Sequence, residues 1–93
     1  MQMEPAKSII EFLGGAKVVA AIIGKHYSRV YRWTYPESTR EGTGGLIPSK
    51  DQRTLLAHAV ASKIDLRPED FFTADRLQRL LAEAEHYRME DAS

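Results

Sequence analysis

Residues 24–33, GKHYSRVYRW, gather cationic and aromatic side chains directly after a single glycine. The ten positions hold two arginines, one lysine, one histidine, two tyrosines and one tryptophan. Arginine, lysine, serine and tyrosine side chains donate hydrogen bonds to phosphate oxygens, and arginine also pairs with the O6 and N7 acceptors of guanine. These residue types indicate contact with nucleic acid, provided that one helix presents them together.

The residues around Gly24 have the spacing of two short helices joined by a tight turn. Ala20, four residues earlier, is small enough for a second helix to cross closely, and glycine suits a turn that needs a positive φ angle. Val30 and Trp33 follow six and nine residues after the glycine, where the second helix turns apolar side chains inward. The sequence therefore predicts a helix-turn-helix unit over about residues 16–34. Its expected core consists of Val19, Ile23, Val30 and Trp33.

Packing of the apolar positions leaves the other side of the second helix to face outward. This outward set is the expected DNA-contact surface: His26, Tyr27, Ser28, Arg29, Tyr31 and Arg32. The expected surface also includes Lys25. Arg40 and Lys50 are expected to contact phosphates. An apolar residue usually follows the turn glycine, and because Lys25 stands there, Tyr27 is an alternative core residue. Ser28, Arg29 and Arg32 are expected to follow the floor of the groove together, and Arg32 is expected to pair with guanine.

Helical periodicity, with glycine and proline breaks, covers most of the remaining chain. Helices are expected over about residues 5–13, 16–23 and 27–34, from residues 48–49 onward, and over about 74–89. Residues 35–47 are expected to form a loop. The stretch RPEDFF, residues 67–72, predicts a short helical turn that buries Phe71 and Phe72. The expected fold class is all-α, a single compact five-helix domain over residues 1–93.

The 13 basic and 13 acidic residues cancel in number but are distributed unevenly. Residues 24–53 hold six lysines and arginines against three acids, which gives plus three. Residues 65–93 hold four arginines against eight acids, which gives minus four. We therefore expect one positive face on a chain of zero net charge, with an acidic C-terminal segment away from it.

The sequence contains no constellation that indicates an enzyme, a cofactor site or a metal site. His26, His58 and His86 are far apart, there is no cysteine, and GTGG at residues 42–45 lacks the GK[ST] of a phosphate-binding loop. The longest apolar run, residues 18–23, is too short to cross a bilayer. We expect a cytoplasmic protein, nucleoid-associated when bound to DNA, with no membrane contact and no small-molecule ligand.

Five stretches of the chain, taken in order, resemble the small helix-turn-helix proteins called carph-isopro domain proteins: IIEFLGGAKVVAAIIG, SRVYRW, GGLIPS, LLAHA and IDLRPEDFF. These belong to the broader Cro- and phage-repressor-like (lambda repressor-like) group, and the resemblance covers about residues 8–72. It implies a compact helical fold that binds an operator in double-stranded DNA, and a role in transcription, commonly repression, in phages or mobile elements. The chain differs from shorter members in its longer YPESTREGTG connection, and from many members in having Lys25 at an apolar position.

The last predicted helix carries an apolar stripe: Leu77, Leu80, Leu81, Ala84 and Tyr87. We expect this stripe to form the seam of a homodimer, because a two-fold pair reads two half-sites one helical turn apart. The acids beside it should face away from DNA, and Arg76, Arg79 and Arg88 are expected to pair across the seam. In one alternative the stripe folds back on its own domain. In another, the protein is an interaction module, such as an antirepressor or adaptor, that binds protein through this helix.

Overall fold

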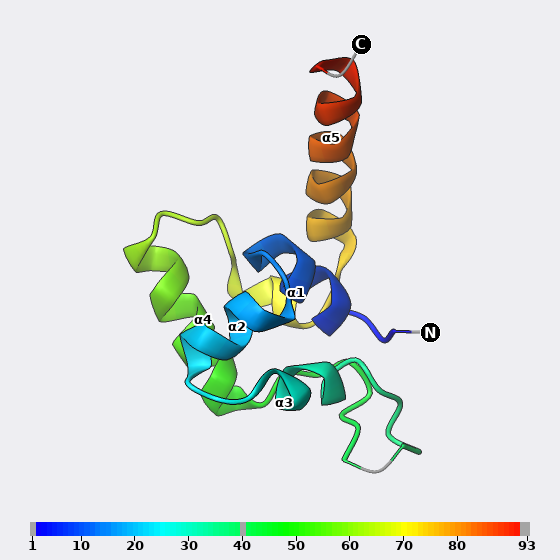
Figure 1. Cartoon of the computed structure of the whole chain (residues 1–93), viewed down its shortest axis with the longest axis vertical. Helices are drawn as coiled ribbons and strands as arrows, with labels where there is room; N and C mark the ends of the chain where they lie inside the picture. The colour runs from blue at the N-terminus through cyan, green and yellow to red at the C-terminus, as the bar shows by residue number, and fades with distance from the viewer. Residues whose placement is uncertain (1, 40, 92–93) are drawn as a thin grey trace.

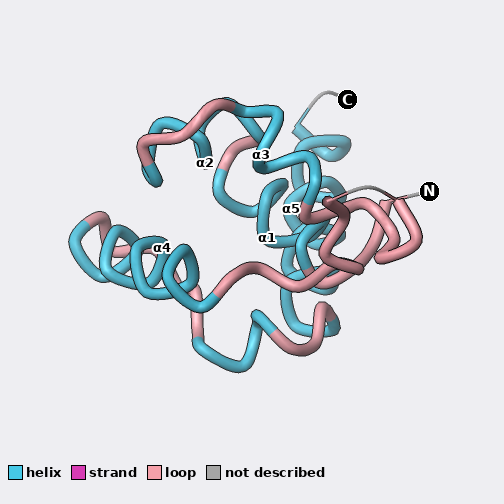
Figure 2. Tube along the Cα trace, turned by 90° about the horizontal axis from the view of Figure 1, so that it is seen from below, coloured by secondary structure: helices cyan, strands magenta, loops and turns pink. Residues whose placement is uncertain are grey.

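A computed structural model describes residues 2–39 and 41–91 of the chain, with side chains through His86. Within these residues it contains five α-helices, one short 3₁₀ turn and no strand (Figures 1 and 2). The elements are α1 (Ala6–Leu13), α2 (Ala16–Ile23), α3 (Tyr27–Arg32), α4 (Ser49–Ala61), η1 (Pro68–Phe71) and α5 (Asp75–Asp91). The predicted all-α fold class with five helices is confirmed.

Glycines set the limits of α2. Gly14 ends the preceding helix with a φ of 112°, and α2 begins directly after Gly15. At the other end Gly24 has a φ of 69°, a left-handed conformation that glycine adopts without a Cβ clash. The backbone N–H of Lys25 then bonds the carbonyl of Ala20 at 3.0 Å and closes the helix end. The limits predicted for this helix, residues 16–23, coincide with those in the structure.

Every element contributes at least one fully buried side chain to a shared hydrophobic core, and the large ones are Ile9, Val19, Val30, Leu55, Phe71 and Leu77. Trp33, 4% exposed, lies in the same core, and Ile23 is half-buried against it. The core predicted for the α2–α3 pair is therefore confirmed, with Ile23 at its edge. Among the helices, α3 packs against α2, and α2 packs in turn against α4, so α2 is the helix that positions α3.

Two apolar residues lie elsewhere than the sequence predicted. Phe72 is 70% exposed, whereas Phe71 is fully buried. Adjacent residues in a 3₁₀ turn project about 120° apart, so both rings cannot enter one core. Leu77, predicted for a homodimer seam, is fully buried in its own domain. Helix α5 packs against α1 and η1, and Leu77 lies in the core that they share.

The acidic helix α5 extends away from α3, as expected. Figure 1 shows α3 at the lower end of the view and α5 rising from the upper end, with its later turns beyond the other helices. The loop after α3 lies beside the N-terminal segment (Figure 2), where the N–H of Ala6 bonds the carbonyl of Gly45 at 3.0 Å. The N–H of Met3 also bonds the carbonyl of Thr34 at 2.8 Å. Two backbone hydrogen bonds thus join the N-terminal segment to the chain that follows α3.

Candidate nucleic-acid interface

The turn between α2 and α3 ends with a side-chain cap on α3. His26 has extended backbone, and its Nδ1 accepts a hydrogen bond from the N–H of Ser28 at 3.2 Å. The Ser28 hydroxyl lies 3.0 Å from the same nitrogen. This cap satisfies one of the free N–H groups in the first turn of α3. His26 was predicted as a DNA contact. Its ring is exposed beside the turn, and its Nδ1 is engaged in the cap.

Aromatic rings line one exposed side of α3. Tyr27 is 42% exposed and Tyr31 39% exposed, so the alternative in which Tyr27 fills the core is wrong. Their ring centroids lie 6.1 Å apart, edge to face, and the His26 ring lies 4.2 Å from that of Tyr27. The Lys17 ammonium of α2 lies 5.9 Å from the Tyr27 ring centroid. Both helices of the pair therefore contribute to one exposed surface.

The arginines of α3 lie on a second exposed side. Arg29 is exposed and Arg32 is half-buried, and both line a hollow with Trp33, Glu41, Thr43 and Pro48. Arg32 does not extend freely into solvent, because its Nη1 lies 2.9 Å from Oε2 of Glu41 in the following loop. The structure thus brings the predicted contact residues of α3 together and adds an acid that the sequence reasoning did not single out.

The loop after α3 caps the C-terminal end of that helix. The N–H of Thr43 bonds the carbonyl of Arg32 at 3.2 Å, and its hydroxyl bonds the carbonyl of Trp33 at 3.1 Å. The N–H of Gly44 bonds the carbonyl of Tyr35 at 2.8 Å. Carbonyls at a helix end have no partner within the helix, so the loop supplies what α3 lacks. The sequence signal was the glycine-rich TGG after a helix stopped by proline, which we interpreted only as a loop.

The three other predicted cations differ in their surroundings. Lys25 does not face the α3 surface freely, since its ammonium lies 3.1 Å from Oδ1 of the buried Asp51 and connects the turn to α4. The Lys25 ammonium, predicted as a DNA contact, is thus engaged in an ion pair, and its side chain is 31% exposed. Lys50 is exposed in the first turn of α4. Arg40 lies outside the described residues.

Along α5, the start of the predicted seam packs within the chain, with Leu77 in the core and Leu80 against it. Leu80 and Leu81 are half-buried, Ala84 is exposed, and the Tyr87 side chain lies outside the described part. Leu81 and Ala84 line a hollow with Glu11 of α1, so this side of α5 faces α1 in part. The guanidinium of Arg76, expected to pair across a dimer seam, instead bonds both carboxylate oxygens of the buried Asp70.

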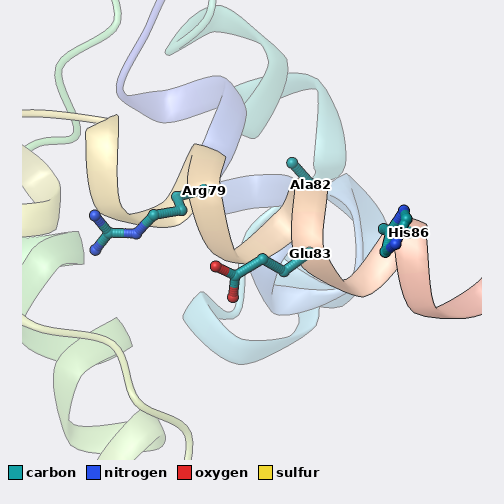
Figure 3. Close-up of a pocket in the computed structure, with 4 residues that line it drawn as sticks. All are labelled: Arg79, Ala82, Glu83 and His86. Carbon is teal, nitrogen blue, oxygen red and sulfur yellow. The ribbon is translucent and has the colours of Figure 1, made fainter.

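A shallow apolar hollow on α5 is unrelated to the α3 surface. Figure 3 shows its four lining residues along one side of this helix: Arg79, Ala82, Glu83 and His86. The side of a single helix does not enclose a ligand. Among residues 2–39 and 41–91, no group of three histidine or acidic side chains is placed to hold a metal ion. No helix in this part is long and apolar enough to cross a membrane.

The chain was compared with protein-family models, with curated proteins and with solved structures, and none of the three comparisons found a match.

Proposed function

We propose that the chain is a sequence-specific regulator of transcription that binds double-stranded DNA through a lambda repressor-like helix-turn-helix. In this proposal α2 and α3 are the two helices of the motif, and α3 enters the major groove. The protein acts as a repressor of phage or mobile-element type, in keeping with its resemblance to the carph-isopro domain proteins. The observation that carries the proposal is the division of α3 into a buried side, with Val30 and Trp33, and an exposed side with Arg29, Tyr27 and Tyr31.

The shape of the pair supports this use. The major groove of B-DNA is about 12 Å wide and admits an α-helix, and recognition helices contact base edges mainly near their N-terminal ends. Ser28 and Arg29 lie in the first turn of α3 and Arg32 is its last residue, and all three supply donors for base edges and phosphates. Lys17 on α2 lies beside Tyr27 and suits a phosphate of the adjoining strand. The acids of α5 are at the other end of the molecule, away from the phosphates (Figure 1).

A salt titration tests the proposal. Affinity for a mixed-sequence duplex should fall steeply with salt, with a log–log slope of about −0.9 for each phosphate neutralised. Selection of bound duplexes from a random pool should then give a defined half-site. A chain that binds no duplex at low salt, or binds with a flat salt dependence, would contradict the proposal.

The second candidate function is a protein-interaction module that keeps the helical fold and binds protein through α5. The observation that favours it is the extension of the later turns of α5 beyond the other helices (Figure 1). A homodimer through the same helix fits the DNA-binding proposal equally, because a single small domain reads too few base pairs to select one site in a genome. The DNA titration separates the two candidate functions, since only the first requires phosphate contacts.

A further inference from the structure

An acid lies beside the arginine that we propose reads DNA. The contact joins Oε2 of Glu41 to Nη1 of Arg32 at 2.9 Å, and both side chains are partly exposed to solvent. Both residues line the hollow that Arg29 also borders. In DNA-free protein, the carboxylate therefore lies where an anionic oxygen of DNA would approach these two guanidinium groups.

The backbone holds Glu41 at this place independently of the ion pair. Glu41 has a φ of 64°, in the left-handed region. The next residue, Gly42, bonds the carbonyl of Thr39 through its N–H at 2.8 Å, and Thr43 bonds the end of α3. A Cβ at position 42 would lie 2.2 Å from the carbonyl oxygen of Pro36, so only glycine allows this close turn. The acid stays near Arg32 even when the two side chains separate.

An exposed ion pair contributes little to stability, so DNA can replace it at small cost. The replacing group matters, however. A phosphate oxygen brought to Arg32 would also approach the carboxylate of Glu41, and two anions at close range repel each other. The O6 and N7 atoms of guanine are neutral acceptors that carry no such penalty.

We propose that Glu41 is a specificity-determining residue that restricts Arg32 to base edges. The carboxylate holds the guanidinium before DNA binds and disfavours phosphate in the hollow, so nonspecific binding is weakened more than binding to the selected site. This inference rests on the proposed function and gives the long loop after α3 two roles, as the cap of that helix and as the carrier of the discriminating acid.

The test compares Glu41→Gln with Glu37→Gln, which removes the same charge from the same loop at an exposed position. Affinity of each variant for a mixed-sequence duplex is measured over a range of salt, and thermal unfolding checks that both are folded. We expect Glu41→Gln to steepen the log–log slope by about 0.9, as for one added phosphate contact. If both chains bind equally at 1 M salt, this steeper slope makes Glu41→Gln bind about eightfold more tightly than the unaltered chain at 0.1 M salt. Glu37→Gln should leave the slope unchanged.

A second measurement shows whether the effect passes through Arg32. In the Arg32→Ala background, Glu41→Gln should change the slope and the affinity less than in the otherwise unaltered chain, because only Arg29 still borders the hollow. In the otherwise unaltered chain, it should lower the preference for the selected duplex over the mixed-sequence duplex. Identical behaviour of Glu41→Gln and Glu37→Gln, or an undiminished effect without Arg32, would overturn the inference while leaving DNA binding intact. Absence of salt-dependent binding by the unaltered chain would reject the proposed function, and this inference with it.

Discussion

The ammonium of Lys25 lies 3.1 Å from Oδ1 and 3.3 Å from Oδ2 of Asp51, a residue only 4% exposed. Lys25 directly follows the turn glycine of the α2–α3 pair, and Asp51 lies in the first turn of α4. A carboxylate at a helix N-terminus is favoured by the helix dipole, and the lysine supplies the remaining counter-charge. The position where an apolar residue was expected thus fixes the turn to α4 by an ion pair.

Lys25→Met should therefore destabilise the fold more than it weakens DNA binding. Methionine keeps the apolar stem but leaves a buried carboxylate without its cation, which costs about 1 to 3 kcal/mol. Chemical denaturation measures the loss, and the Lys25→Met/Asp51→Asn double variant should recover part of it, because the buried group is then neutral. If Lys25→Met instead leaves the stability unchanged and weakens DNA binding, Lys25 contacts DNA.

Trp33→Ala should cost about 3 to 5 kcal/mol of unfolding free energy, the usual range for removing a large buried aromatic side chain. Trp33 is almost fully buried at the end of α3, so the cavity also removes packing that holds this helix to the core. Tyr35→Ala, two residues later at an exposed position, is the matched control and should change stability by about 0.5 kcal/mol or less. Comparable losses in both variants would show that the Trp33 ring contributes no more to the core than the exposed Tyr35 ring does.

Local sequence signals were sufficient for the helices themselves. Gly15 and Gly24 bound α2 on both sides, so its limits could be read directly. The end of α3 was predicted at Thr34 but lies at Arg32. Beyond that residue the chain continues in i→i+3 bonds, from the N–H of Trp33 to Val30 and of Thr34 to Tyr31, which tighten the last turn. Periodicity does not distinguish such a turn from one more α-helical step.

Contacts between distant segments could not be predicted in the same way. The apolar stripe of α5 showed that Leu77 needed cover, but not that α1 and η1 of the same chain provide it. Similarly, the charge of Glu41 gave no sign of its contact with Arg32, because that contact depends on how the loop folds against α3. A single sequence shows which side of a helix is apolar or charged. It does not show which segment of the chain packs against that side.

Glu4 makes part of the stability dependent on pH. Burial raises its pKa, but hydrogen bonds from the Ser8 side chain, from Gln78 and from the Ser8 N–H outweigh burial and hold the pKa below the usual value. A carboxyl whose pKa is lowered by folding stabilises the protein above its unfolded pKa, roughly 4.3, and this contribution is lost as the pH falls through the lower folded pKa. Ser8 is in the first turn of α1, and its N–H bonds Oε1 of Glu4 at 2.8 Å.

Glu4→Gln should therefore lower stability at neutral pH by about 1 kcal/mol, as for loss of a helix cap, and the difference from the unaltered chain should shrink as the pH falls below roughly 4. Denaturation at a series of pH values measures both effects. Glu11→Gln, which removes an exposed carboxylate from α1, is the control and should leave the stability at neutral pH nearly unchanged. A pH-independent difference would mean that shape rather than charge matters at this position.

Arg32→Ala and Lys50→Ala should weaken DNA binding in different ways. Loss of an arginine that pairs with guanine costs about 1 to 3 kcal/mol of discrimination, so Arg32→Ala should lower the preference for the selected duplex. Loss of a phosphate contact weakens all sequences alike and reduces the salt slope by about 0.9, which is expected for Lys50→Ala. Competition between selected and mixed-sequence duplexes measures both. Equal losses on the two duplexes for Arg32→Ala would show that Arg32 contacts phosphate.

The homodimer, proposed together with DNA binding, is tested at an exposed position of the predicted seam on α5. Ala84 is exposed on the predicted seam, and Ala82 is exposed on the outer side of the same helix. An arginine at position 84 adds bulk and charge to a two-fold contact without touching the core, so Ala84→Arg should be a folded monomer. It should also lose cooperative binding to paired half-sites about 34 to 36 Å apart. Ala82→Arg should still dimerise. Sedimentation at several concentrations measures the oligomeric state of both variants and of the unaltered chain. If the unaltered chain stays monomeric at high concentration, pairing occurs only on DNA.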